Sequence, residues 1–214
     1  QAHFLSNVAE FLEYDEGAAV LDVYAPCQSE HGISDEQAAN RGRLAVRTRV
    51  YPLFVHDPRA GESQSDRFIL AGNPNPGDLW VTNRLAYVDD EGKKAQLNVP
   101  LTPADYAIGE ARFARQFRPL RDADEAGATP IHEYVELDAE DRVGRVPFVY
   151  TTDADDRLVR VGCSAAIVEF VEDRRRNWEM LQYLAGQPLV DLKAEHAKAL
   201  AELQAQFEKA AQES

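Results

Sequence analysis

Apolar positions at the start of the chain follow a helical spacing and then an extended one. A set of apolar residues falls on one face of a helix over residues 2–14, and this amphipathic spacing predicts a helix there. The set is Phe4, Leu5, Val8, Phe11 and Leu12. Residues 18–25 form a short run rich in β-formers, which predicts a buried strand. Pro26 ends that strand because proline has no N–H for a sheet ladder.

A second helix and a second strand follow. Ser34 has the side chain of an N-cap, and the helix that it opens is expected to end before Pro52. Residues 51–55 form another short apolar segment and predict a strand. Because helices and strands alternate, the pattern predicts α/β layering with parallel strands.

The middle of the chain is less regular. Residues 57–76 are rich in glycine, proline, serine and asparagine and predict a loop-rich extension. Short strands are expected ahead of an acidic turn at residues 89–92. Thr102 followed by Pro103 is a strong helix start, since a capping hydroxyl precedes a proline at the first helical position. That helix is predicted over residues 103–117.

The last part of the chain predicts a smaller unit. Two β-rich segments, residues 146–150 and 157–161, flank an acidic turn and predict a hairpin. A helix follows and ends at Gly186, with Pro188 just beyond it. A last amphipathic helix, over residues 196–210, is expected to pair with it as an antiparallel helical hairpin.

The expected fold class is therefore α/β: a parallel sheet with helices, followed by a smaller α+β unit that ends in a helical hairpin. The first domain is expected to cover residues 1–120, including the loop-rich extension. The second covers residues 131–214. The acidic, glycine-containing segment between them predicts the boundary.

Composition and charge narrow the classes of function. The 214-residue chain has a formal net charge of −14, which argues against a nucleic-acid partner because phosphates would be repelled. No apolar run is long enough to cross a bilayer and no leader-like segment opens the chain, so we expect a cytoplasmic protein with no membrane partner. The chain begins at Gln1 rather than Met, which suggests a piece of a longer protein. Two cysteines fit a reducing compartment rather than a disulfide framework.

Cys27, at the end of the first predicted strand, is the leading candidate for chemistry. Its thiol is a metal ligand, a nucleophile or an inert buried side chain. Cysteine catalysis needs a histidine beside the thiol and a third group that orients the histidine. His31 is near in sequence, but no third group can be identified. From position alone, inert burial is the simplest interpretation.

A motif around this cysteine adds a family resemblance. The run Tyr-Ala-Pro-Cys at residues 24–27, followed by His-Gly-Ile at residues 31–33, resembles the pyruvate:ferredoxin (flavodoxin) oxidoreductases. These 2-oxoacid:acceptor oxidoreductases use thiamine diphosphate. Further segments similar to the family are residues 50–54, 57–58, 68–70 and 73–74. The resemblance covers residues 1 to about 80, and the loop after Cys27 is one residue longer than the family pattern.

The resemblance implies that the first unit is the C-terminal part of a thiamine diphosphate-binding domain. It also implies that Cys27 ligates the [4Fe–4S] cluster nearest that cofactor, which passes single electrons onward. In this family a Gly-Asp-Gly segment, which binds the cofactor through Mg, and the Cys-x-x-Cys cluster ligands lie upstream. Neither motif is present here. The chain by itself is therefore expected to be inactive, without thiamine diphosphate, Mg or cluster.

The implied reaction of the parent enzyme is oxidative decarboxylation of a 2-oxoacid to an acyl-coenzyme A. Its partners would be coenzyme A, the 2-oxoacid, ferredoxin or flavodoxin, and the remainder of the parent. A second hypothesis is a non-catalytic assembly or electron-partner docking module. The last helix fits either assembly into a homo-oligomer or a cover for the second unit's core.

Other candidate residues have simpler interpretations. A group of arginines after the Cys27 loop could steer an acidic ferredoxin or bind a coenzyme A phosphate, although pairing with neighbouring acids is the simpler explanation. The group is Arg41, Arg43, Arg47 and Arg49. Cys163 is expected to pack under a helix, and the arginines at residues 174–176 to lie on a solvent face. His3, His56, His132 and His196 lack metal-ligand spacing.

Overall fold

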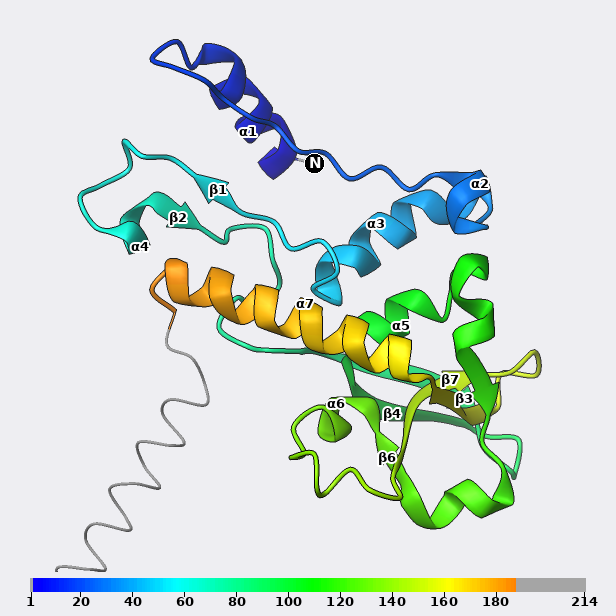
Figure 1. The fold of residues 1–214 in the computed structure, drawn as a ribbon. Helices are drawn as coiled ribbons and strands as arrows, with labels where there is room; N and C mark the ends of the chain where they lie inside the picture. Colours follow the sequence, from blue (N-terminus) through cyan, green and yellow to red (C-terminus); the bar gives the residue numbers. More distant parts are fainter. Residues whose placement is uncertain (1, 188–214) are drawn as a thin grey trace, which may run out of the picture.

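The structure is a computed structural model that describes residues 2–187 and has a mixed α/β fold, as the sequence predicts. Its helices are α1 (Ala2–Glu13), α2 (Gln28–His31), α3 (Ala38–Arg47), α4 (Gln64–Arg67), α5 (Pro103–Ala107), α6 (Ile131–Tyr134) and α7 (Ala165–Leu184). Its strands are β1 (Val55–His56), β2 (Phe68–Ile69), β3 (Val81–Val88), β4 (Lys94–Leu101), β5 (Phe117–Pro119), β6 (Ala128–Pro130), β7 (Val146–Thr152) and β8 (Leu158–Cys163). Three 3₁₀ helices complete the described elements: η1 (Asp35–Gln37), η2 (Ala111–Gln116) and η3 (Asp122–Gly127). Helix α7 crosses the middle of the molecule, with α3 and β1–β2 on one side and the longer strands on the other (Figure 1).

The first predicted helix is confirmed as α1, but the strand predicted after it is wrong. Residues 18–25 run extended without a ladder partner among the described residues, and the Val20 side chain is 90% exposed. A strand needs a neighbouring strand to satisfy its N–H and C=O groups, and a β-prone sequence does not supply one. Figure 1 shows α1 and this segment standing away from the main body.

The helix predicted after Ser34 is present as η1 followed by α3, and Ser34 forms a capping box with Gln37. The next strand is shorter than predicted, because β1 begins only at Val55. It pairs antiparallel with β2. The other strands that begin within residues 1–120 also pair antiparallel, β3 with β4 and β5 with β8. The parallel layer expected there is therefore not formed by the described residues.

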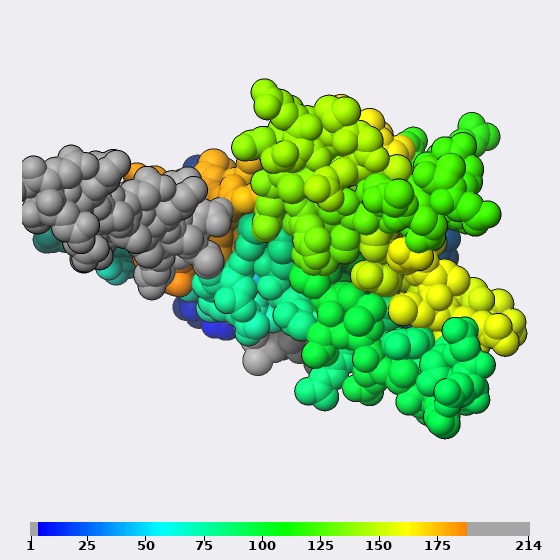
Figure 2. All heavy atoms as spheres, turned by 90° about the horizontal axis from the view of Figure 1, so that it is seen from below, coloured from blue at the N-terminus to red at the C-terminus, as the bar shows by residue number. Residues whose placement is uncertain are grey.

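Strands β3 and β4 form a long antiparallel hairpin around the predicted acidic turn. Asp89 closes that turn, since its Oδ1 accepts the backbone N–H groups of Glu91 and Lys93 at 3.0 and 2.8 Å. The Val88 N–H donates to the Asp156 carbonyl at 2.8 Å, so the hairpin touches the turn between β7 and β8. The two turns lie side by side at one end of the molecule (Figure 2).

The helix predicted over residues 103–117 starts as expected and ends early. Thr102 and Asp105 form a capping box and Pro103 occupies the first turn of α5. The helix stops after Ala107 and the chain continues as η2 and β5. Gly109 is a poor helix former, and the space that a Cβ would take there is filled by the guanidinium of Arg41. The prediction beyond Ala107 is therefore wrong.

The largest sheet has four strands in the order β5-β8-β7-β6. The predicted hairpin is confirmed as β7 and β8, and β6 pairs parallel to β7. The sheet thus takes β5 from the first predicted unit and β6 from the segment predicted to separate the two units. The division at residues 121–130 stays a prediction.

The core lies between this sheet and α7. The α7 residues predicted to face inward are almost all buried, since Ile167, Val168, Val171, Trp178 and Leu181 are at most 8% exposed. Ala104 and Ala107 of α5 and Val149 of β7 pack with the first three of these residues, whereas Trp178 and Leu181 form a second cluster with Leu70. The helix ends at Leu184, two residues before the predicted Gly186, which has a φ of +66°. The last predicted helix lies outside the described residues.

Candidate functional site

Cys27 lies exposed immediately before α2, at the end of the extended segment. Its sulfur is 3.3 Å from the Ser29 hydroxyl oxygen. Hydrogen bonding to Ser29 and to the backbone of Glu30 holds the pKa of the Cys27 thiol below its ordinary value. This favours the thiolate, which is the form that ligates metals. The interpretation of Cys27 as an inert buried residue is therefore wrong.

His31, at the other end of α2, folds back on Cys27. Its backbone N–H donates to the Cys27 carbonyl at 3.0 Å, and its Nδ1 accepts the Cys27 backbone N–H at 3.3 Å. Gly32 closes the turn with a φ of +61°, a left-handed conformation that favours glycine. The polar contact of His31 is with the backbone of Cys27 rather than with its thiol, so the geometry does not favour a Cys–His nucleophile pair.

A buried carboxylate lies beneath His31. The side chain of Glu110 is 0% exposed, and its Oε1 is 3.9 Å from Nδ1 of His31. Its other oxygen accepts a hydrogen bond from Nε of Arg112 at 2.7 Å. At 3.9 Å the contact with His31 is too long for a hydrogen bond, so Glu110 does not orient His31 as the third group of a catalytic triad would. It follows His31 by 79 positions (110 − 31), with no motif to link the two.

Tyrosines connect the Cys27 loop to the same region. The Tyr24 ring stacks on His31 at 6.1 Å between centroids and packs against Tyr51 at 5.2 Å. The Tyr24 hydroxyl hydrogen bonds to the hydroxyl of Tyr106 in α5. Burial, and then hydrogen bonding to Glu110 and Tyr24, raises the pKa of Tyr106 above its ordinary value. Burial and a hydrogen bond to Asp22 raise the pKa of Tyr51 to about 12, so both phenols stay neutral.

The arginines after the loop do not form the patch considered from the sequence. Arg41 is 7% exposed, with its guanidinium 5.1 Å from the ring centroid of Tyr106, and Arg49 is fully buried. Arg43 and Arg47 donate to the side-chain oxygens of Asn40 and Asn83 rather than to carboxylates. The expected pairing with neighbouring acids is therefore wrong, and so is a shared anion-binding surface. Two of the four side chains are too buried to provide one.

The second cysteine is a structural residue, as predicted. Cys163 ends β8 and packs against the main core cluster. Burial raises the pKa of its thiol to about 12, so it stays protonated. Among residues 2–187, no group of three or more histidine, cysteine, aspartate or glutamate side chains is arranged to hold a metal ion. Within the same range, no helix has the length and apolar character needed to cross a membrane.

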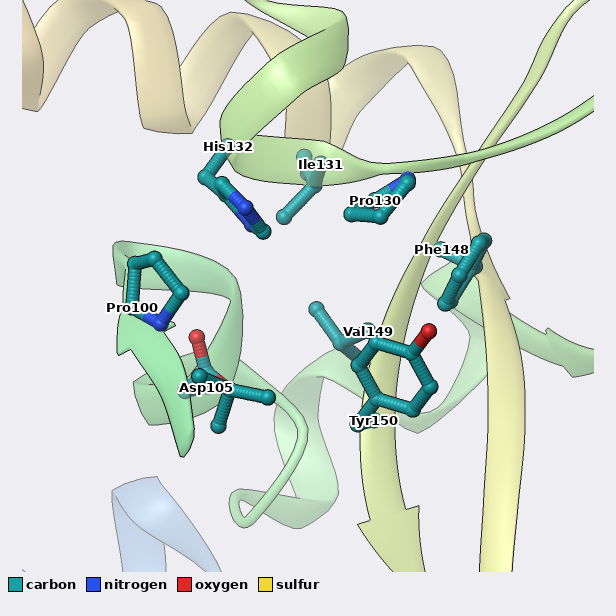
Figure 3. Close-up of a pocket in the computed structure, with 9 residues that line it drawn as sticks. Pro100, Asp105, Pro130, Ile131, His132, Phe148, Val149 and Tyr150 are labelled. Carbon is teal, nitrogen blue, oxygen red and sulfur yellow. The ribbon is translucent and has the colours of Figure 1, made fainter. Parts of the chain in front are cut away.

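A small recess of about 10 Å³, room for about one water molecule, lies between β4, α6 and β7, and Cys27 does not line it. Figure 3 shows His132 and Ile131 on one side of it and Asp105 and Tyr150 on the other. Asp105 is engaged by Thr102, whose N–H and hydroxyl donate to it at 2.7 and 2.8 Å. Burial lowers the pKa of His132, whose nearest acid is Glu133 at 3.6 Å. Because Asp105 is bonded to Thr102 and His132 lies nearest Glu133, these two side chains do not form a catalytic acid–base pair.

Comparison with known proteins adds no assignment: no protein-family model, curated protein or solved structure matches this chain.

Proposed function

We propose that this chain is the C-terminal portion of a 2-oxoacid:ferredoxin or flavodoxin oxidoreductase-like enzyme, in which Cys27 supplies one thiolate to a [4Fe–4S] cluster. The observation that carries the proposal is the exposed Cys27 thiol, whose pKa is lowered, at the motif that carries the resemblance. An exposed sulfur can reach ligands that come from elsewhere. A thiolate-favouring environment suits iron ligation.

The residues present fit one ligand of such a cluster. Cys163 is not a second ligand, because its thiol is half-buried in the core and stays protonated. When bound, the cluster would carry single electrons away from the substrate adduct on thiamine diphosphate. What this chain contributes is the thiolate and the turn of α2 that presents it. The other thiolates, thiamine diphosphate and Mg would have to be held by the remainder of the parent enzyme.

The exposed N-terminal segment also supports the proposal, because its apolar side chains lack a covering layer in the described residues. Its apolar side chains Leu12, Val20 and Val23 are 73, 90 and 52% exposed. Residues 18–25 carry apolar side chains on both faces, as strands do when both faces of a parallel sheet are covered. This composition suits a strand of a thiamine diphosphate-binding domain whose other strands lie in the parent enzyme.

The test is the iron content of the intact parent purified without oxygen. We expect Cys27→Ser to remove most of one [4Fe–4S] cluster. The matched control, Cys163→Ser, should leave the iron content unchanged. The coding sequence ahead of Gln1 should also encode a Gly-Asp-Gly segment and a Cys-x-x-Cys. The absence of both motifs, or unchanged iron in Cys27→Ser, would contradict the proposal.

A non-catalytic assembly module is the second candidate, and the same exposed segment favours it. An apolar arm on a folded body is a common means of docking to a partner subunit. The two candidates differ in what the arm needs. An assembly module would bring the purified 214-residue chain together as a homo-oligomer through residues 4–23, whereas an enzyme portion would need the parent's own sheet. Light scattering on the chain with and without Val20→Asp separates these outcomes.

A further inference from the structure

The Cys27 loop is held in place by side chains rather than by a sheet. The segment that leads into it, residues 18–25, makes no backbone ladder among the described residues. Helix α2 is a single turn, and one turn of helix is not stable by itself. The direction in which the Cys27 thiol points must therefore be set by contacts between the loop and the body of the protein.

Three of these contacts converge on one short segment, residues 106–111. The Tyr24 hydroxyl bonds to the hydroxyl of Tyr106. The His31 imidazole lies 3.9 Å from the Glu110 carboxylate. Gly32 packs so closely that a Cβ at its position would be 2.4 Å from the Cβ of Ala111. On the loop side, the contacts are made by Tyr24, which precedes Cys27, by His31 at the end of α2, and by Gly32, which closes the turn.

The receiving segment is itself buried and closely packed. Tyr106 and Glu110 are each 1% exposed. The Arg41 guanidinium stacks over the Tyr106 ring, and Arg112 fixes one oxygen of Glu110 at 2.7 Å. A side chain at Gly109 would collide with Arg41, since its Cβ would lie 2.4 Å from Nη2. Tyr106 and Glu110 are therefore each packed against an arginine side chain.

The presence of a buried carboxylate at Glu110 is not explained by the stability of the fold alone. Burying a carboxylate is costly unless all its oxygens are hydrogen bonded, and an apolar side chain would serve the core better. Its Oε1 lies 3.9 Å from Nδ1 of His31, and the carboxylate also interacts with the Tyr106 hydroxyl. The imidazole in turn accepts the Cys27 backbone N–H. Because Nδ1 accepts this N–H and lies 3.9 Å from Oε1, the contact between Glu110 and His31 is a packing contact and not a hydrogen bond.

We propose that Tyr106 and Glu110 are positioning residues that hold the Cys27 loop, acting through Tyr24 and His31. The consequence for a cluster ligand rests on the proposed function, but the positioning itself does not. Both residues lie beyond the part of the sequence that carries the family resemblance. The presentation of Cys27 therefore depends on a region that the resemblance does not cover.

The test uses the two cysteines of the chain as reporters. Labelling with ¹⁵N-cysteine gives two amide signals, one from Cys27 and one from Cys163 in β8. In the unmodified chain both should have order parameters of about 0.85, typical of rigid backbone. In Glu110→Ala and in Tyr24→Phe, the order parameter of Cys27 should fall below about 0.6 while that of Cys163 stays high.

The choice of variants keeps the result interpretable. Arg115→Ala, on the exposed face of η2, is the matched control and should leave both amides rigid. If Glu110→Ala also lowers the order parameter of Cys163, that variant has disturbed the whole fold. Tyr24→Phe, which removes only one hydroxyl from the loop, then tests the proposal. A rigid Cys27 amide in both variants would overturn the proposal. Because iron is not measured, the result is independent of whether Cys27 is a cluster ligand in the parent.

Discussion

The guanidinium carbon of Arg49 lies 4.0 Å from the ring centroid of Trp178, and both side chains are fully buried. The indole N–H of Trp178 donates to the Asp78 carbonyl at 2.9 Å. The guanidinium donates to the backbone carbonyls of Pro74, Asn75, Asp78 and Leu79. Burial lowers the pKa of Arg49 to about 10, so the group is still charged at neutral pH. One side chain thus joins the segment after α3, the loop at residues 74–79 and α7.

Replacing Arg49 with methionine should destabilise the protein by about 3 kcal/mol, because several buried carbonyls would lose their donor. Arg49→Lys should lose nearly as much, since an ammonium lacks the planar fork that reaches these carbonyls. Urea denaturation followed by circular dichroism measures both. Arg43→Met, at an exposed arginine of α3 bonded to Asn40, is the control and should change stability by less than about 0.5 kcal/mol. Equal effects at the two positions would contradict the assignment.

The parts of the fold that the sequence predicts correctly are those with local signals. The burial of α7 follows from its helical spacing, and the β7–β8 hairpin from the acidic turn between two β-rich runs. The prediction of a strand at residues 18–25 fails because strand formation depends on a partner strand, which the local sequence does not describe. The burial of Arg49 is not predicted from the sequence, for a related reason. Its partners are carbonyls 25 to 30 positions away, and no residue type marks a carbonyl as an acceptor.

The candidate site divides in the same way. Cys27 is identified from a motif within its own loop. Tyr106 and Glu110 are missed because they contact that loop only through the tertiary fold. Gly109 is a local sign of the break after α5, but glycine in a loop has many uses and does not point to a contact. The contact between Arg41 and Tyr106 is likewise visible only once α3 and α5 are packed together.

Asp105 should make stability depend on pH in a direction opposite to most carboxylates. Burial raises its pKa to about 6, above the ordinary value of 3.8, so the folded state binds the proton more tightly than the unfolded state. Its contribution to the free energy of unfolding is therefore fully present below pH 3.8 and is lost as the pH rises through about 6. We expect the change to be about 1–2 kcal/mol, since the side chain keeps some solvent contact.

The measurement is urea denaturation of the wild type and of Asp105→Asn between pH 4 and 8, compared as a difference. Asparagine does not titrate in this range, so the difference isolates Asp105 from the other acids. The wild type should gain stability relative to the variant as the pH falls from about 7 to about 4. A difference that is constant across this range would show that Asp105 titrates normally.

The two thiols should differ greatly in reactivity. Cys27 is exposed and its pKa is lowered, whereas burial raises the pKa of Cys163 to about 12. At pH 8 a much larger fraction of Cys27 than of Cys163 should be thiolate, because the two pKa values are shifted in opposite directions. A chromogenic disulfide reagent should therefore show one fast and one very slow phase. Cys27→Ser should abolish the fast phase and Cys163→Ser should leave it; two similar rates would contradict the assigned environments.

Alanine substitutions at three glycines can distinguish a steric clash of the new Cβ from strain in the backbone. Gly42, in α3, has a helical φ, and a Cβ at its position would meet no atom within 4 Å. Gly42→Ala should therefore stabilise the protein by about 0.5–1 kcal/mol. Gly92 also has open space, but its φ is +79°. Gly92→Ala should therefore destabilise by about 1 kcal/mol from backbone strain alone.

Gly32 combines both penalties, because its φ is +61° and a Cβ would lie 2.4 Å from that of Ala111. Gly32→Ala should destabilise by about 2 kcal/mol or more, since the loop has to move away from η2. Thermal denaturation of the three variants in one buffer gives the order directly. If Gly32→Ala cost no more than Gly92→Ala, the close packing of the Cys27 loop on Ala111 would be absent in solution. The wild-type loop would then need to be anchored by Tyr24 and His31 alone.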